Sequence, residues 1–149
     1  MFNKETEYAI RGLVYVKLQN LKKRRPGTTE IAREIDAPHF FTAKILQRLV
    51  RSGYLRSMKG KGGGFYFDEN DPDLSLRDLI SATEGSASIS SCGFGLKQCD
   101  EKNPCPLHEK YAPIRDSISR LVDEETVSGL AEKVYSKEFK NLKKTRIHK

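Results

Sequence analysis

The chain has 149 residues, and its 37% of hydrophobic residues are enough for one modest core with a further arm. It contains no run of about 18 apolar residues of the kind that crosses a membrane. Its start, MFNKETEYA, is acidic early and lacks the apolar core of a secretory signal. We therefore expect a cytoplasmic protein with no membrane partner.

The net charge of +7 is unevenly placed along the chain. Residues 1–67 hold 14 Lys+Arg against 5 Asp+Glu, whereas residues 68–149 hold 13 against 15. A basic half joined to a near-neutral half is typical of a protein that meets a polyanion. A solvated basic surface is the alternative, and charge alone does not separate the two.

The basic half predicts a helix-turn-helix. Apolar residues recur at helical spacing over 4–21, and a basic turn follows at 22–27. Thr28 can cap a short helix over 29–35, and Pro38 suits the first turn of a third helix that runs to about residue 52. A short helix, a tight turn and a longer helix with a basic outer face are typical of DNA-reading domains.

The third predicted helix has one apolar and one polar face. Its inward stripe is expected to consist of Phe41, Ile45, Leu46 and Leu49. Its outward residues are expected to be His39, Thr42, Lys44, Gln47, Arg48 and Arg51. His39 can serve equally as a solvent-exposed capping residue.

A β-hairpin is predicted directly after this helix. Two short apolar segments flank the glycine-rich tip KGKGGG at 59–64. A nucleotide-binding loop is excluded by context, since a strand rather than a helix follows the glycines. A hairpin in this position is a wing, and its lysines can enter a minor groove or contact phosphates. The residues predicted to contact DNA are Thr28, His39, Phe40, Thr42, Ala43, Lys44, Arg48, Arg56, Lys59 and Lys61.

An acidic loop at 68–73 separates the wing from another short helix. Ser75 and Asp78 have the spacing of a capping box, and Leu74 and Leu79 that of a hydrophobic staple. This helix is expected to end near Gly85.

All three cysteines lie in one polar segment, CGFGLKQCDEKNPCPLH, which closes on His108. Burial does not explain thiols in a loop with so few apolar residues. Three thiolates and an imidazole instead favour an iron–sulfur cluster or a metal. Zinc remains the alternative, as does an oxidisable loop, although the segment has no Cys-x-x-Cys pair. Cys105 and His108 are expected on one face of the first turn of the last long helix, since they are three residues apart.

That last helix carries an apolar stripe of Tyr111, Ile114, Ile118, Leu121 and Val122. A second copy of the chain is the simplest surface for the stripe to cover, because duplex DNA is usually read by two-fold dimers. The alternative is packing on the helix at 4–21 of the same chain. One more short helix is expected over 126–135.

These segments together resemble a known family. YAIRGLVYV, TTEIAREIDAP, ILQRLVRSGYLRSMKGKGGGFYF and LSLRDLISATEG, then three cysteines before a long helix, resemble the Rrf2 family of bacterial winged-helix regulators over residues 1–134. The most specific piece is the wing pattern of Ser57, Lys59, Gly60, Gly63 and Gly64. The resemblance implies that the three cysteines assign the chain to the branch that binds an iron–sulfur cluster.

The resemblance implies a mainly α fold with a small β-hairpin wing and a long C-terminal dimerisation helix. It implies a homodimer on partly palindromic operator DNA, with one 2Fe-2S or 4Fe-4S cluster in each subunit. Cys92, Cys99 and Cys105 fall on the thiolate ligands, and His108 falls on the fourth. Glu7 of the partner subunit is the alternative fourth ligand. Without the resemblance, Glu7 is explained as an ordinary acidic residue in the first turn of a helix.

The implied function is a transcriptional regulator, expected to be a repressor. Its operator affinity would be controlled by a cluster that senses redox state, nitric oxide or cluster supply. The alternative is a winged-helix regulator with a structural zinc site and no cluster sensing.

Three features depart from the family pattern. Six residues separate the first two cysteines, where five or fewer is usual. Ala43 stands where some members have a glutamate that discriminates between operators. Lys59 replaces the usual wing arginine, which keeps a basic contact but not bidentate reading of guanine.

The expected organisation is a winged helix-turn-helix domain at 1–85 and a cluster-binding loop at 86–109. A dimerisation helix with a C-terminal helix follows at 105–135, and a frayed basic tail occupies 136–149. No paired carboxylates, nucleophile–base motif or phosphate loop indicates an enzyme. A small redox carrier would leave the basic half and the wing unexplained.

Overall fold

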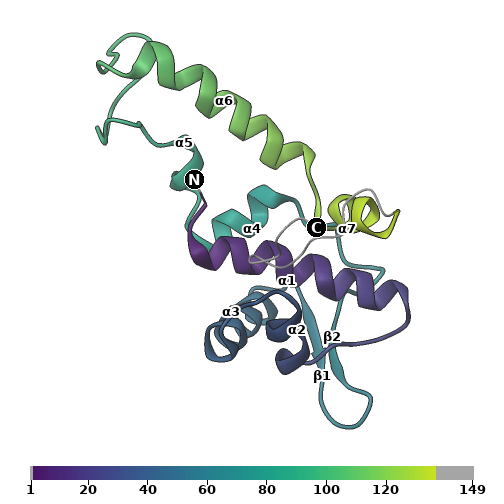
Figure 1. Ribbon diagram of the computed structural model, residues 1–149. Helices are drawn as coiled ribbons and strands as arrows, with labels where there is room; N and C mark the ends of the chain where they lie inside the picture. Colours follow the sequence, from purple (N-terminus) through teal and green to yellow (C-terminus); the bar gives the residue numbers. More distant parts are fainter. Residues whose placement is uncertain (1, 137–149) are drawn as a thin grey trace, which may run out of the picture.

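The computed structural model describes residues 2–136, so most of the predicted basic tail lies outside the described residues. Helices dominate this part of the chain, and its one sheet is a two-stranded hairpin, as predicted (Figure 1). The elements in order are α1 (Lys4–Leu21), α2 (Thr28–Glu34), α3 (His39–Arg51), β1 (Arg56–Met58), β2 (Gly64–Tyr66), α4 (Leu76–Thr83), α5 (Ala87–Ser90), α6 (His108–Glu124) and α7 (Val127–Tyr135).

Helix α1 is the centre of the fold and contacts α2, α3, α4, α7 and β2. Asn3 caps it, because the Asn3 side chain accepts a hydrogen bond from the Thr6 N–H. Leu13 and Val16 are fully buried and form a core with apolar residues of α2, α3 and α4. Helices α2 and α3 and, through β2, the wing are thereby fixed to one helix.

The helix-turn-helix forms as predicted, with small changes at its boundaries. Gly27 rather than Thr28 is the N-cap of α2, and Thr28 is its first residue. Asp36 adopts a positive φ of 54° in the tight turn that leads to α3. Pro38 is the N-cap of α3, so this helix begins at His39.

The prediction that Thr42 lies on the outward face of α3 is wrong. Thr42 is 3% exposed, and its hydroxyl donates to the Pro38 carbonyl at 2.9 Å. The inward stripe follows the spacing of Thr42, Ile45, Leu46 and Leu49, all of which are buried. Phe41 is 38% exposed instead, where it makes an edge-on contact with Tyr8 of α1.

The wing is an antiparallel pair in which Ser57 lies opposite Phe65. The base of the wing packs closely on the main chain of Met58 and of Arg25, because Gly63 and Gly64 carry no side chain. A Cβ on Gly63 would lie 2.1 Å from the Met58 carbonyl oxygen, and one on Gly64 would lie 2.2 Å from that of Arg25. Gly64 also has a φ of +145°, which other residues rarely adopt.

Helix α4 begins as the sequence predicts. Ser75 is its N-cap and accepts a hydrogen bond from the Asp78 N–H at 3.1 Å. Leu74 and Leu79, the predicted staple, are both buried in the same core as α1. The four-residue helix α5 was not predicted.

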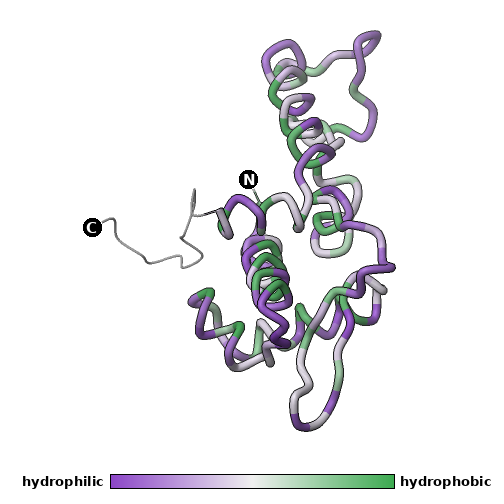
Figure 2. The backbone as a smooth tube through the Cα atoms, turned by 90° about the vertical axis from the view of Figure 1, so that its right-hand side faces the viewer, coloured by the Kyte–Doolittle hydropathy of each residue, from purple (hydrophilic) through white to green (hydrophobic). Residues whose placement is uncertain are grey.

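Helix α6 rises away from the body of the protein, with the cysteine loop at its far end (Figure 1). It begins at His108, so the prediction that Cys105 opens it is wrong. Pro106 and Leu107 form a turn before the helix, and the His108 N–H donates to the Cys105 carbonyl at 3.0 Å. Apolar residues recur along α6 beyond the body (Figure 2).

Helix α7 returns to the body and packs on α1. Thr126 is its N-cap, and Ala131 is buried against Val14 and Leu18. Among the described helices, none combines the length and the apolar character needed to cross a membrane.

Candidate nucleic-acid interface and cysteine centre

The start of α3 presents an exposed aromatic ring beside a cation. Phe40 is 72% exposed, and the Lys44 ammonium lies 4.9 Å from its ring centroid. His39 is exposed, and its Nε2 lies 3.1 Å from the Thr29 hydroxyl of α2. His39 therefore links the two helices of the motif, whereas Pro38 is the N-cap of α3 and no side chain makes a capping hydrogen bond there. Thr28 and Ala43 are half-buried at the same end.

Two of the predicted DNA-contacting arginines are paired within the chain. Arg48 of α3 forms an ion pair with Glu5 of α1. Arg56 donates two hydrogen bonds of 2.8 Å to the carboxylate of Asp71, in the acidic loop after the wing. This pairing raises the pKa of Arg56 and lowers that of Asp71. Arg56 therefore holds the acidic loop against β1 and is not a free cation.

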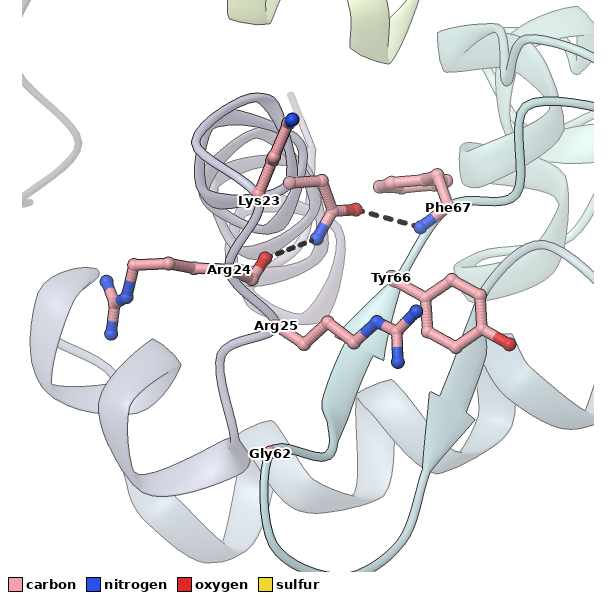
Figure 3. Close-up of a pocket in the computed structure, with 7 residues that line it drawn as sticks. Lys23, Arg24, Arg25, Gly62, Tyr66 and Phe67 are labelled. Atoms are coloured by element: carbon pink, nitrogen blue, oxygen red, sulfur yellow. Dashed lines mark hydrogen bonds between the residues drawn. The ribbon is translucent and has the colours of Figure 1, made fainter.

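The wing tip is basic and exposed. Lys59 and Lys61 are both exposed, and the described ion pairs include neither residue. Beside the wing, a cavity of about 430 Å³ lies between β2 and the turn at 22–25 (Figure 3). Its lining consists of Asn20, Lys23, Arg24, Arg25, Gly62, Tyr66 and Phe67.

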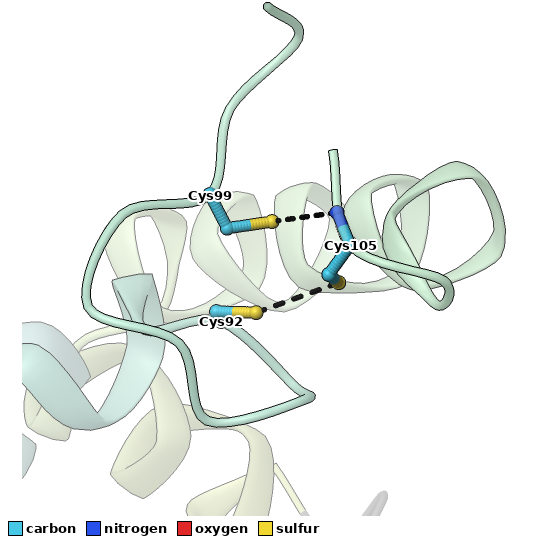
Figure 4. A group of neighbouring side chains, drawn as sticks. All are labelled: Cys92, Cys99 and Cys105. Atoms are coloured by element: carbon cyan, nitrogen blue, oxygen red, sulfur yellow. Dashed lines mark hydrogen bonds between the residues drawn. The ribbon is translucent and has the colours of Figure 1, made fainter. Parts of the chain in front are cut away.

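The three cysteines come together at the start of α6 (Figure 4). Their Sγ atoms all lie within 4.8 Å of one another, and those of Cys92 and Cys105 are 3.5 Å apart. Cys105 is buried, whereas Cys92 and Cys99 are half-buried. The loop between them thus folds back so that thiols 13 residues apart converge.

Backbone groups of the loop point at these sulfurs. The N–H groups of Leu96 and Phe94 donate to Cys92 and outweigh the effect of burial, so the pKa of Cys92 falls to about 7. The Cys105 N–H donates to Cys99 at 3.4 Å, which favours the thiolate. Burial and the neighbouring thiols oppose that effect, and the pKa of Cys99 is raised overall. Donors of this kind stabilise negative charge on sulfur, as a metal centre requires.

His108 adjoins the thiols within the same chain. Its Nδ1 lies 3.4 Å from the Cys99 Sγ. Glu7, the alternative fourth ligand, lies on α1, where its carboxylate is 3.9 Å from the Lys4 ammonium. His108 is thus the donor that the chain itself brings beside the thiols.

The donor set fits an iron–sulfur cluster or a zinc ion. Three convergent sulfurs with an adjacent imidazole supply soft ligands, and the loop backbone supplies hydrogen bonds to sulfur. Cys92, Cys99 and Cys105 would hold the group, with His108 beside them.

Tyr111 of α6 positions the loop that carries Cys92. A Cβ on Gly93 would lie 2.9 Å from three atoms of the Tyr111 ring. The ring therefore packs directly on the main chain next to the first cysteine. The sequence marks Tyr111 only as part of an apolar stripe, so this contact is a functional feature that periodicity does not reveal.

The predicted dimerisation stripe divides into an exposed and a buried part. Ile114 is 55% exposed and Leu121 is 48% exposed, whereas Ile118 is half-buried. Val122 is fully buried against Leu76, Ile80 and Ile89 of its own chain, so the expectation that it contacts a partner is wrong. The sequence pattern did not separate these roles, because Val122 follows Leu121 at the edge of the stripe.

Comparisons with known proteins agree with this architecture. Residues 2–133 match the family Rrf2, described as "Iron-dependent Transcriptional regulator". Protein aau3 of Rhizobium meliloti is 34% identical over 85% of this chain and 82% of its own length. The HTH-type transcriptional repressor NsrR of Streptomyces coelicolor is 25% identical over 85% of each chain.

Solved structures share the fold. The global cysteine regulator CymR of B. subtilis superposes with a TM-score of 0.71 at 20% identity, covering 89% of this chain and 96% of its own. The T. potens IscR structure gives 0.70 at 16% identity, covering 93% and 91%. The winged fold, the wing glycines and a family match over nearly all described residues lead to one conclusion: the chain belongs to the Rrf2 family of transcriptional regulators.

Proposed function

We propose that this protein is a DNA-binding repressor whose operator affinity is controlled by an iron–sulfur cluster. The observation that carries the proposal is the convergence of three cysteine sulfurs, within 4.8 Å of one another, at the start of α6. The family description as iron-dependent and the repressor named among the relatives support it.

The DNA-reading surface consists of the start of α3 and the wing. Phe40 offers an apolar surface for a thymine methyl group or a sugar, and Lys44 lies beside it. Lys59 and Lys61 reach phosphates or the minor groove from the wing tip. Arg48 and Arg56 contribute only if their ion pairs open.

The exposed face of α6 pairs two copies of the chain. Tyr111, Ile114 and Leu121 are exposed on the same helix, and a row of exposed apolar residues is typical of a protein–protein interaction site. A two-fold dimer through α6 would place two α3 helices on half-sites one turn of duplex apart, ~34 Å.

The residues of the site link the cysteine centre to the dimer helix. Cys105 and His108 join the loop to α6, and the Tyr111 ring holds the main chain beside Cys92. The cluster would link the cysteine loop to α6 through bonds that are lost when the cluster is oxidised or removed. Without the cluster, the loop from Cys92 to Cys105 is held by weaker contacts. The populations of DNA-competent and incompetent dimers would then shift.

The decisive experiment is anaerobic purification followed by absorption spectroscopy and analysis of iron, sulfide and zinc. We expect a brown protein with iron and sulfide in comparable amounts. Cys92→Ala and His108→Ala should lose the group, whereas Gln98→Ala, an exposed loop residue, should retain it. Glu7→Ala tests the partner subunit as ligand donor. A colourless protein with one zinc per chain would replace cluster sensing with a structural zinc site.

Control of DNA binding needs its own measurement. A duplex selected from a random pool should bind the cluster-loaded, cluster-free and triple Cys→Ala proteins with different affinities. Equal affinities for the three forms would leave a winged-helix regulator without cluster sensing.

A further inference from the structure

We propose that the basic turn at residues 22–25 and the base of the wing form a second phosphate-binding surface for duplex DNA. This inference rests on the proposed DNA-binding function and extends it. It adds a contact on a connection that is neither the reading helix nor the wing tip. It also fixes which side of the wing the DNA backbone follows.

The turn carries four consecutive cations, Lys22, Lys23, Arg24 and Arg25, all of them exposed. In the described part of the chain, its ion pairs join only Arg24, to Glu30 at 2.9 Å. Three positive charges therefore remain for an external anion. A basic turn that is merely solvated would need no fixed position, and the next contacts show that this turn has one.

The Asn20 side chain and one main-chain hydrogen bond fix the turn to β2. The side-chain amide of Asn20 donates to the carbonyl of Arg24 at 2.9 Å and to that of Phe65 at 3.3 Å. Its oxygen accepts from the Phe67 N–H at 2.8 Å. The Phe65 N–H donates to the Pro26 carbonyl at 2.9 Å. These hydrogen bonds hold the turn that carries the cations in one conformation. The turn therefore loses little conformational entropy when it binds an anion.

Arg25 is ordered against the wing. Its guanidinium carbon lies 4.5 Å from the centroid of the Tyr66 ring, and its Nη1 is 2.8 Å from the Met58 sulfur. Stacking on an aromatic ring leaves the outer N–H groups of an arginine free to donate to phosphate. Figure 3 shows this guanidinium beside Tyr66 and the Arg24 side chain directed away from the wing.

The cavity between the turn and the wing has no acidic residue in its lining. Gly62 contributes to that lining and follows Lys61, so the cavity lies next to the wing tip. A second cavity, of about 200 Å³, has the opposite character, with a lining that includes Asp68, Glu69, Asp71 and Asp73. The acidic loop meets the wing at β1, where Asp68 and Asp71 pair with Arg56, so the basic turn lies beside β2 and the acidic loop beside β1. A phosphate backbone is attracted to the first and repelled by the second, so the DNA strand follows the side of the α1–α2 turn.

The test is the salt dependence of duplex binding. Log K for binding falls as log salt rises, and each phosphate contact that is lost makes this negative slope shallower by about 0.9. We expect the double variant K23Q/R25Q to make the slope shallower by roughly 1–2. It should weaken binding to the selected duplex and to a scrambled duplex by the same factor, since phosphate contacts carry no sequence information. Arg120→Gln, which removes one exposed cation from α6, should leave the slope unchanged.

Further variants separate the possible failures. Lys23→Gln alone removes an exposed charge with no described side-chain contact, so it tests the idea even if Arg25→Gln unfolds the wing. Arg25→Lys should keep most of the slope. If the wild-type protein binds no duplex, the proposed function fails. If the wild type binds and Lys59→Gln weakens binding, but K23Q/R25Q keeps the wild-type slope, only this inference is overturned. A third outcome is also informative: K23Q/R25Q keeps the wild-type slope, and inorganic phosphate raises the melting temperature of the wild type but not of the variant. That outcome would overturn the DNA contact and assign a small-anion site instead.

Discussion

The guanidinium of Arg48 on α3 pairs with the carboxylate of Glu5 on α1, so a predicted DNA contact is held by the chain's first helix. We predict that Glu5→Gln tightens duplex binding and steepens the salt slope by about 0.9, because Arg48 becomes free to reach a phosphate. The stability change should be small, about 0–1 kcal/mol, since the pair is partly exposed. Fluorescence anisotropy over a salt series measures the slope.

Glu132→Gln is the matched control, because it removes one exposed carboxylate from α7. If both variants bind duplex equally tightly, general charge explains the gain, and Arg48 has no role in reaching DNA.

The contact between Gly93 and Tyr111 gives a prediction about the cysteine centre. A methyl group on Gly93 would lie 2.9 Å from the Tyr111 ring, so Gly93→Ala should displace the loop beside Cys92 and lower iron retention several-fold. Truncating the ring should restore the space, so Gly93→Ala combined with Tyr111→Leu should regain iron retention relative to Gly93→Ala alone. Iron and sulfide analysis of anaerobically purified protein measures the effect. A double variant that retains no more iron than Gly93→Ala would show that the ring contact is not the cause.

The wing glycines give a prediction with an internal control. Gly62 and Gly64 both have positive φ, but a Cβ on Gly62 meets nothing within 4 Å. Gly62→Ala should therefore cost only backbone strain, about 1–2 kcal/mol. Gly64→Ala adds a collision with the Arg25 carbonyl, so it should cost more and also weaken DNA binding by displacing the turn. Urea unfolding and anisotropy measure the two effects. Equal losses of stability in the two variants would contradict the close approach of β2 to the turn.

The pH dependence of stability should report on Glu30. Burial raises the pKa of Glu30, but hydrogen bonds from Tyr15 and Arg24 outweigh it, and the pKa lies below its ordinary value of 4.5. A lowered folded-state pKa means that the ionised form stabilises the fold above pH 4.5 and that this contribution is lost as the pH falls further. Glu30→Gln should be less stable than the wild type at pH 7, and the gap should narrow in acid. Urea midpoints measured from pH 7 to pH 3 test this, and a gap that stays constant would rule out the linkage.

Local signals in the sequence predicted most of the fold. The capping-box spacing at Ser75 and the periodicity of α1 mark helices directly, and the wing glycines mark the hairpin. The sequence predicts the start of α6 too early, at Cys105, because Pro106 is typical of a first helical turn, whereas Pro106 and Leu107 form a turn before the helix. Thr42 was misplaced because its polar side chain suggested exposure, whereas its spacing from Ile45 and Leu49 places it inward.

The candidate site was predicted in part. The clustering of cysteines in one segment was enough to predict that the thiols meet, as they do. The sequence could not show that Arg48 and Arg56 are paired, because their partners lie 43 and 15 residues away. The contact of Tyr111 with Gly93 likewise depends on how the loop returns to α6. Pairing of two chains through α6 remains a prediction.

The two crowded glycines at the hairpin base bear on attempts to change which operator the protein recognises. The atoms that obstruct a side chain there belong to the main chain of Met58 and Arg25, so no second-site side-chain mutation can make room. A combinatorial library aimed at new recognition should therefore hold Gly63 and Gly64 constant. Diversity belongs at Lys59 and Lys61 and on the exposed positions of α3, where the scaffold imposes no comparable obstruction.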